Sequence, residues 1–183
     1  MHAAGIYEGD HQVCATDFVV SSYTPSLSAI IKSREGFLPV PREKLHLLAY
    51  GESSAPGQFH IPSVEEEVDI VTGLMLSTSA TVANSVNVAL TPQLVLDQLP
   101  AAHILHLACH GQQRTDPLQS CFVLSGGLLT ISDLMKIDLS NTMIAFLSAC
   151  ETAKGDKDQP DQAVHLAASM LFCGFRSVVA TMW

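Results

Sequence analysis

The sequence lacks the features that most readily identify metal, redox or membrane proteins. Its five cysteines include no Cys-x-x-Cys pair, so neither a zinc ribbon nor a thioredoxin-type site is indicated. No uninterrupted apolar run approaches the roughly 18 residues of a membrane span. The opening residues, "MHAAGIYEGDHQ", carry acids where a secretory signal needs a basic start and an apolar middle. We therefore expect a cytoplasmic protein with no membrane partner and with reduced thiols.

Basic residues are also scarce. Nine Lys and Arg stand against 18 Asp and Glu, and the formal net charge is −9. Nucleic-acid binders present a basic face to the phosphates, so nucleic acid is excluded as an expected partner. A glycine-rich phosphate loop is missing as well, because neither "SGG" nor "GESSAPG" matches one. The missing phosphate loop argues against a flavodoxin-like nucleotide binder, which we keep only as a third and weakest functional alternative.

Apolar residues, by contrast, are abundant. They make up 48% of the chain, charged residues make up 15%, and the mean hydropathy is +0.28. Such a chain can fill a core and is not expected to be disordered. A length of 183 residues suits one domain.

Short β-rich runs alternate with helix signals along the chain. Strands are predicted over residues 17–23, 44–50, 103–109, 121–124, 142–150 and 177–183. Helices are predicted over residues 24–34, 63–76, 91–99 and 162–175, with a short one from about Ser132. Ser63 and Glu66 are spaced as a capping box at the start of the second helix. Strands and helices alternate along the chain, and the central strands are apolar throughout. This pattern predicts an α/β fold, with a mostly parallel sheet covered by helices on both faces.

The segment "HILHLACHG" raises the question of a metal site. His106 and His110 are four residues apart, as in zinc proteases, but those enzymes need a glutamate directly after the first histidine. Leu107 occupies that position, and the segment has the composition of a strand, in which neighbouring side chains point to opposite faces. His103 and His106 are therefore expected to be structural strand residues, and no metal is expected.

A cysteine–histidine pair is the better chemical hypothesis. In parallel α/β sheets, sites form at the carboxyl ends of the strands, and His110 and Cys150 each end an apolar run. A catalytic thiol needs an imidazole to accept its proton. The N–H groups of Gly111 and Cys150 could bind an oxyanion, since Gly111 has no side chain to obstruct a substrate. Cys109 is expected to point away from His110 into the core.

Two motifs, "HILHLACHG" and "FLSACET", strongly resemble those of the CHAT domain, a caspase-like module often found behind tetratricopeptide repeats. The stretches "VVSSYTPSLSAI", "PGQFHIPSVEEEV" and "HLAASMLFCGFRSVVATMW" extend the resemblance over nearly the whole chain. Many fungal proteins carry this version. The sequence departs from true caspases, which have Gln-Ala-Cys at the nucleophile where this chain has Ser-Ala-Cys.

The resemblance implies a caspase/separase-like cysteine endopeptidase. His110 would be its general base and Cys150 its nucleophile, with Gly111 as an oxyanion-hole or turn residue. Glu151 and Thr152 would line the pocket rim. The expected reaction is peptide-bond cleavage through a thioester, with no metal or organic cofactor. The substrate would be a protein or peptide, and a repeat-containing protein would be a partner.

The resemblance also implies a caspase-like three-layer sandwich over residues 17–183, preceded by an N-terminal extension over residues 1–16. Family members usually continue beyond "TMW", so we expect the domain to be incomplete at its C-terminus and to expose an apolar sheet edge. A competing class follows from this expectation: a non-catalytic caspase-like module that serves protein interaction or signalling.

Overall fold

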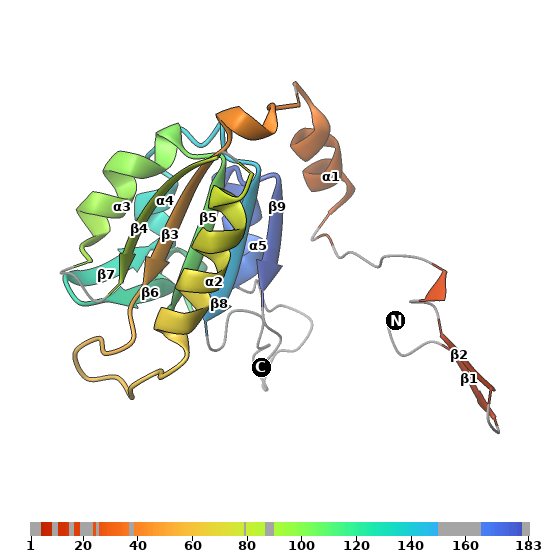
Figure 1. Cartoon of the computed structure of the whole chain (residues 1–183), viewed down its shortest axis with the longest axis horizontal. Helices are drawn as coiled ribbons and strands as arrows, with labels where there is room; N and C mark the ends of the chain where they lie inside the picture. Colours follow the sequence, from red (N-terminus) through yellow and green to blue (C-terminus); the bar gives the residue numbers. More distant parts are fainter. Residues whose placement is uncertain are drawn as a thin grey trace.

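A sheet of seven strands forms the centre of the protein (Figure 1). The structure is a computed structural model that describes residues 5–8, 11–14, 17–18, 24, 26–36, 39–78, 80–86, 90–149 and 166–180. Five strands run parallel in the order β4–β3–β5–β8–β9. Their bounds are Thr81–Val86 (β4), His46–Gly51 (β3), Ile104–Gln112 (β5), Ile144–Ala149 (β8) and Ser177–Ala180 (β9).

An antiparallel hairpin extends the sheet where β5 continues beyond its parallel neighbours. Its strands are β6 (Cys121–Leu124) and β7 (Gly127–Thr130). β6 pairs with the last three residues of β5, and His110 lies opposite Val123. The sequence predicted β6 but placed the end of β5 at Cys109, three residues too early. His110 and Gly111 consequently lie inside a strand.

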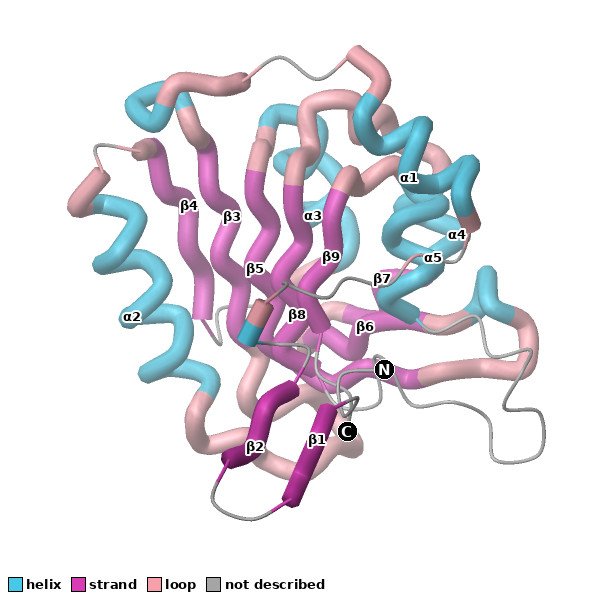
Figure 2. The backbone as a smooth tube through the Cα atoms, turned by 90° about the vertical axis from the view of Figure 1, so that its right-hand side faces the viewer, coloured by secondary structure: helices cyan, strands magenta, loops and turns pink. Residues whose placement is uncertain are grey.

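Helices cover the sheet on both faces (Figure 2). α2 (Val64–Leu76) packs on one face. α3 (Pro92–Gln98), α4 (Ile131–Leu134) and α5 (Leu166–Cys173) pack on the other. β3 is buried on both sides, because alternate residues join different apolar clusters: Leu47 packs with Val64 and Val68 of α2, whereas Leu48 packs in the larger cluster opposite. The predicted three-layer α/β sandwich is confirmed.

The N-terminal part contains smaller elements. β1 (Gly5–Glu8) and β2 (His11–Cys14) pair with each other in an antiparallel hairpin, and α1 (Leu27–Arg34) follows. Short 3-10 turns occur at Arg42–Lys44, Leu99–Ala101 and Pro117–Gln119. The predicted strand over residues 17–23 is wrong at Asp17 and Phe18, which lie in a helical turn; its other residues lie outside the described part.

The capping box predicted at Ser63 is also wrong. α2 does begin at the next residue, but Ser63 has a helical backbone (φ −85°, ψ −6°) and its side chain makes no capping hydrogen bond. An N-cap side chain needs an extended backbone to reach the free N–H groups. Thr91 has that geometry and accepts from the N–H of Leu94. A complete capping box instead joins Thr130 and Asp133 at the start of α4.

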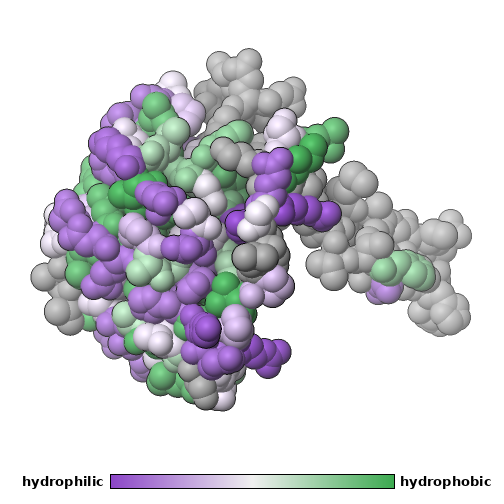
Figure 3. Space-filling view, turned by 90° about the horizontal axis from the view of Figure 1, so that it is seen from above, coloured by the Kyte–Doolittle hydropathy of each residue, from purple (hydrophilic) through white to green (hydrophobic). Residues whose placement is uncertain are grey.

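Both polar and apolar side chains are exposed on the described part of the chain, and Phe59 and Leu74 are among the apolar ones. In the face seen in Figure 3, hydrophilic residues are spread widely and smaller apolar areas lie between them. None of the described helices is both long enough and apolar enough to cross a membrane.

Candidate active site

His110 lies where β5 leaves the parallel part of the sheet. Parallel pairing with β3 extends to Ala108 and parallel pairing with β8 extends to Cys109. From His110 onward the strand pairs antiparallel with β6. Gly111 is buried opposite Phe122, so it is a strand residue and not the turn residue that was expected as one option. The imidazole therefore sits at the carboxyl edge of the parallel strands, where α/β proteins build their sites.

A backbone carbonyl holds the His110 ring. The His110 Nε2 atom lies 2.6 Å from the carbonyl oxygen of Phe59. A carbonyl can only accept, so Nε2 carries the hydrogen and donates it. In the neutral imidazole this leaves Nδ1 with a free lone pair. The contact thus selects the tautomer in which Nδ1 is the basic atom.

The Phe59 carbonyl comes from a loop over residues 52–63, between β3 and α2. The Glu52 N–H donates to the Ala108 carbonyl at 2.8 Å, which attaches the start of the loop to β5. The Ile61 N–H donates to the Ser53 carbonyl at 2.8 Å and closes the loop on itself. These bonds fix both sides of the segment that reaches His110.

The Glu52 carboxylate is the buried anchor of this loop. Only 2% of Glu52 is exposed. Its Oε1 accepts from the Ser54 N–H at 3.3 Å, and its Oε2 accepts from the Ser125 N–H at 2.8 Å. Ser125 lies in the turn between β6 and β7, so Glu52 joins the loop to the hairpin that also pairs with His110. Glu52 was not predicted as a site residue, although it directly follows an apolar strand and so fits the strand-end position that selected His110.

A second side-chain pair stiffens the loop near Phe59. The Ser54 hydroxyl lies 2.9 Å from His60 Nδ1. Both residues are exposed, so this bond adds order to the loop surface and little stability.

The partner predicted for His110 lies outside the described residues. Cys150 follows the last described residue of β8, and Glu151 and Thr152 come next; all three lie beyond the described part. The described register pairs Ala108 with Ser148 and Cys109 with Ala149.

A polar cluster lies on the α2 face of these two strands. The Ser148 hydroxyl donates to Glu67 Oε2 at 2.9 Å, and Glu67 Oε1 lies 3.3 Å from His106 Nε2. The His106–Glu67 contact is close, but it lacks the geometry of a hydrogen bond. The His106 ring also packs against Phe146, with the ring centres 5.4 Å apart. Glu67 lies in the helix predicted over residues 63–76, but the sequence did not indicate this pairing.

His106 and His103 have the structural roles that were expected. His106 is 1% exposed; burial lowers its pKa, and the nearby Glu67 carboxylate opposes this in part. His103 Nδ1 accepts from the His46 N–H at 3.1 Å at the opposite end of the strands. Among the described residues, no three His, Cys, Asp or Glu side chains gather closely enough to hold a metal ion.

Comparison with known proteins identifies the family. A sequence model of the CHAT domain matches residues 1–183. The chain belongs to the CHAT domain family. No curated protein sequence matches it. Among solved structures, the chain is similar to the Arg-specific cysteine proteinase gingipain R, with 12% sequence identity and a TM-score of 0.54.

The alignment with gingipain R covers 79% of this chain and 32% of that protein, so the CHAT chain spans about a third of the neighbour's length. At this identity the likeness shows a shared fold, and it confirms the caspase-like arrangement of sheet and helices. The chain thus belongs to the CHAT domain family and has a fold similar to that of a cysteine proteinase.

Three thiols in the described part of this CHAT domain, those of Cys109, Cys121 and Cys173, are wholly or partly buried. Cys109 and Cys121 are buried, and Cys109 belongs to the core opposite α2, as expected from its position beside His110. Burial raises the pKa of Cys121, and it raises that of Cys173 to about 11. Because the thiolate is the nucleophile, Cys121 and Cys173 should react more slowly at neutral pH than a cysteine whose pKa is lowered.

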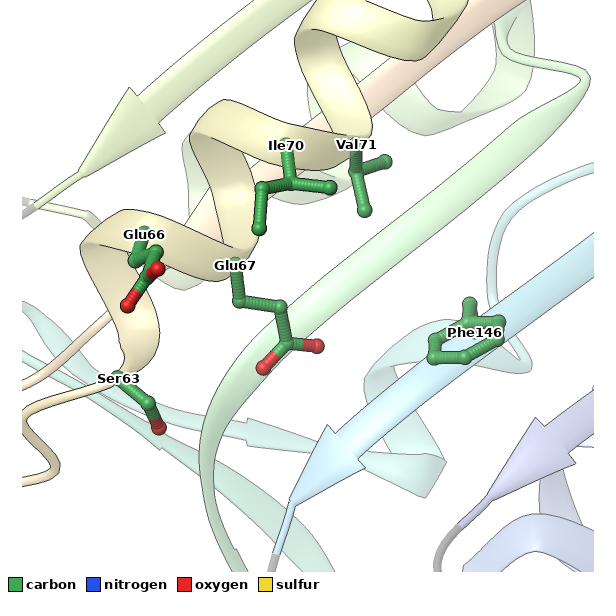
Figure 4. Close-up of a pocket in the computed structure, with 6 residues that line it drawn as sticks. All are labelled: Ser63, Glu66, Glu67, Ile70, Val71 and Phe146. Carbon is green, nitrogen blue, oxygen red and sulfur yellow. The ribbon is translucent and has the colours of Figure 1, made fainter.

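A hollow of about 360 Å³ lies beside the polar cluster, between α2 and β8 (Figure 4). Its lining combines carboxylates with apolar side chains: Ser63, Glu66, Glu67, Ile70, Val71 and Phe146. Phe146 faces the hollow from β8, and the other five come from α2 and its first flanking residue.

Proposed function

We propose that this CHAT domain is a cysteine endopeptidase in which His110 is the general base and Cys150 is the nucleophile. The observation that carries the proposal is the 2.6 Å contact between His110 Nε2 and the Phe59 carbonyl. It holds the His110 imidazole, at the carboxyl edge of the parallel strands, in the one neutral tautomer whose Nδ1 is available as a base.

The strand register supports the choice of Cys150. Its last described pair is Cys109 with Ala149. Continued by one residue, the same register would pair position 110 with position 150. Side chains at such paired positions share a face of the sheet. This extrapolation makes Cys150 the thiol expected next to the His110 ring.

The proposed reaction proceeds through a thioester. His110 Nδ1 removes the proton from the Cys150 thiol, and the thiolate attacks the carbonyl carbon of the scissile peptide bond. The resulting oxyanion would be bound by the N–H groups of Gly111 and Cys150. The amine leaves with the proton from the imidazolium. His110 then removes a proton from water, and the hydroxide attacks the thioester carbonyl. The C–S bond breaks and releases the acid product, and the Cys150 thiolate takes the proton back from the imidazolium.

We further propose a protein or peptide substrate, a repeat-containing protein as partner, and cytoplasmic action. Glu151 and Thr152, next to the proposed nucleophile, would contribute to the substrate pocket. No metal or organic cofactor enters the proposed steps.

Cleavage of a peptide mixture tests the proposal. His110→Ala and Cys150→Ala should each abolish cleavage and leave the far-ultraviolet circular dichroism unchanged. Cys173→Ala is the matched control, since it removes a described thiol whose pKa is raised to about 11, and it should cleave like the wild type. Equal cleavage with and without Cys150 would refute the assignment. A wild-type Cys150 that reacts no faster than Cys173 with a thiol reagent would favour the non-catalytic interaction module.

A further inference from the structure

The polar cluster on the α2 face contacts both β5, which carries His110, and β8, which ends one residue before Cys150 in the sequence. β5 and β8 adjoin over six paired positions, from Ile104 with Ile144 to Cys109 with Ala149. Glu67 of α2 contacts both strands: Oε2 accepts from Ser148 at 2.9 Å, and Oε1 lies 3.3 Å from His106 Nε2.

Strand alternation relates these contacts to the proposed site. Residues two apart on a strand share a face, so His106 lies on the same face of β5 as His110. Ser148 likewise lies two residues before Cys150 on β8. The Glu67 carboxylate therefore contacts each strand on the face that carries His110, and the same alternation, continued by one residue beyond β8, would put Cys150 on that face.

The contacts of Glu67 are partly shielded from water. His106 is 1% exposed, and the Glu67 side chain is 29% exposed. Phe146 packs against the His106 ring and so covers the cluster from β8. The hydrogen bond from Ser148 to the Glu67 carboxylate therefore restrains Ser148 more strongly than a fully exposed bond would.

We propose that Glu67 is a positioning residue, which holds Ser148 and His106 and thereby fixes the relative placement of the ends of β8 and β5. The inference rests on the proposed function. Without this link, the two strand ends would keep their main-chain pairing but would lose the side-chain connection through α2. A displacement of about 1 Å between base and nucleophile is enough to slow catalysis substantially.

Glu66 provides a control that lies one residue away. It has the same charge, belongs to the same helical turn, and also lines the hollow, but it is exposed and lies farther from Phe146 of β8 than Glu67 does (Figure 4). Glu67→Met removes both carboxylate oxygens and keeps a side chain of similar length. Glu66→Met makes the same chemical change at a position that the proposal does not use.

The test measures steady-state cleavage and the alkylation rate of Cys150 in the whole chain, below the temperature at which any variant unfolds. Glu67→Met should lower kcat about tenfold, leave KM within about twofold, and slow alkylation. Glu66→Met should match the wild type. Ser148→Ala should behave like Glu67→Met, Ser148→Thr should restore most of the rate, and the Ser148→Ala/Glu67→Met double variant should be no slower than either single variant.

Several outcomes would overturn the proposal. A raised KM with unchanged kcat would make Glu67 a binding residue, and a lower melting temperature with unchanged kinetics would make its role structural. If Cys150 is alkylated faster than Cys173 in the wild type and equally fast in Glu67→Met, this inference is refuted and the proposed function is not. A wild-type protein that neither cleaves peptides nor alkylates faster at Cys150 than at Cys173 would refute the proposed function, and this inference with it.

Discussion

Replacing Glu52 should destabilise the protein far more than replacing an exposed glutamate. Glu52→Ala leaves the N–H groups of Ser54 and Ser125 without their acceptor, at a position that is 2% exposed. Hydrogen bonds to charged groups contribute about 1.5–3 kcal/mol each. Part of this gain is offset in the native protein by the cost of burying the carboxylate. We therefore expect a loss of about 3 kcal/mol in the free energy of unfolding.

Urea unfolding followed by circular dichroism measures this loss. Glu43→Ala is the matched control, because Glu43 is exposed in the turn before β3, and it should change the free energy of unfolding by less than about 0.5 kcal/mol. Glu52→Gln keeps one acceptor oxygen for one N–H but places its amide NH₂ group against the other. Its loss in the free energy of unfolding should therefore lie between the losses of Glu52→Ala and Glu43→Ala. A loss below about 1 kcal/mol for Glu52→Ala would refute the reasoning, because the two bonds would then contribute no more than surface contacts.

Three further predictions concern packing, protonation and thiol chemistry. A Cβ at Gly51 would lie 2.6 Å from Val64 Cγ1, so Gly51→Ala should cost about 1–3 kcal/mol in urea unfolding, whereas Gly73→Ala, with open space around it, should stabilise α2 by about 0.5–1 kcal/mol. Burial holds the pKa of His106 below its ordinary 6.5, so the unfolded chain binds a proton there that the native chain does not. The free energy of unfolding of the wild type should therefore fall as the pH drops below about 6.5. Between about pH 8 and about pH 5, the free energy of unfolding of His106→Gln should fall by less than that of the wild type, because the variant has no imidazole to titrate at this position. Cys173, with a pKa raised to about 11, should be alkylated slowly at neutral pH, and its rate should still be rising at about pH 10.

The fold was largely predictable because its central strands are apolar on both faces. β3, β5 and β8 have continuous hydrophobic runs, and the sequence placed each of them within a few residues. β4 was missed because it is the edge strand of the sheet, and its sequence, "TVANSV", is half-exposed and mixed in polarity. Without a buried face on each side, an edge strand carries a weaker periodic signal.

The candidate site was predictable only in part. His110 and Gly111 could be selected from the strand-end rule, since their residue types carry the chemistry. The Phe59 carbonyl could not, because every residue has a carbonyl and only the folded loop brings this one within 2.6 Å of the imidazole. Glu67 could not be selected either, because its partner Ser148 lies 81 residues away and such pairing depends on the tertiary fold.

Mass-spectrometric mapping of a thiol-reactive peptide probe is the most direct measurement of the central claim, the activation of Cys150 by His110. At neutral pH the account predicts labelling at Cys150 in the wild-type chain, loss of that label in His110→Ala, and an unchanged label in Cys173→Ala. A label that persists without His110, or that spreads evenly over the cysteines, would contradict it.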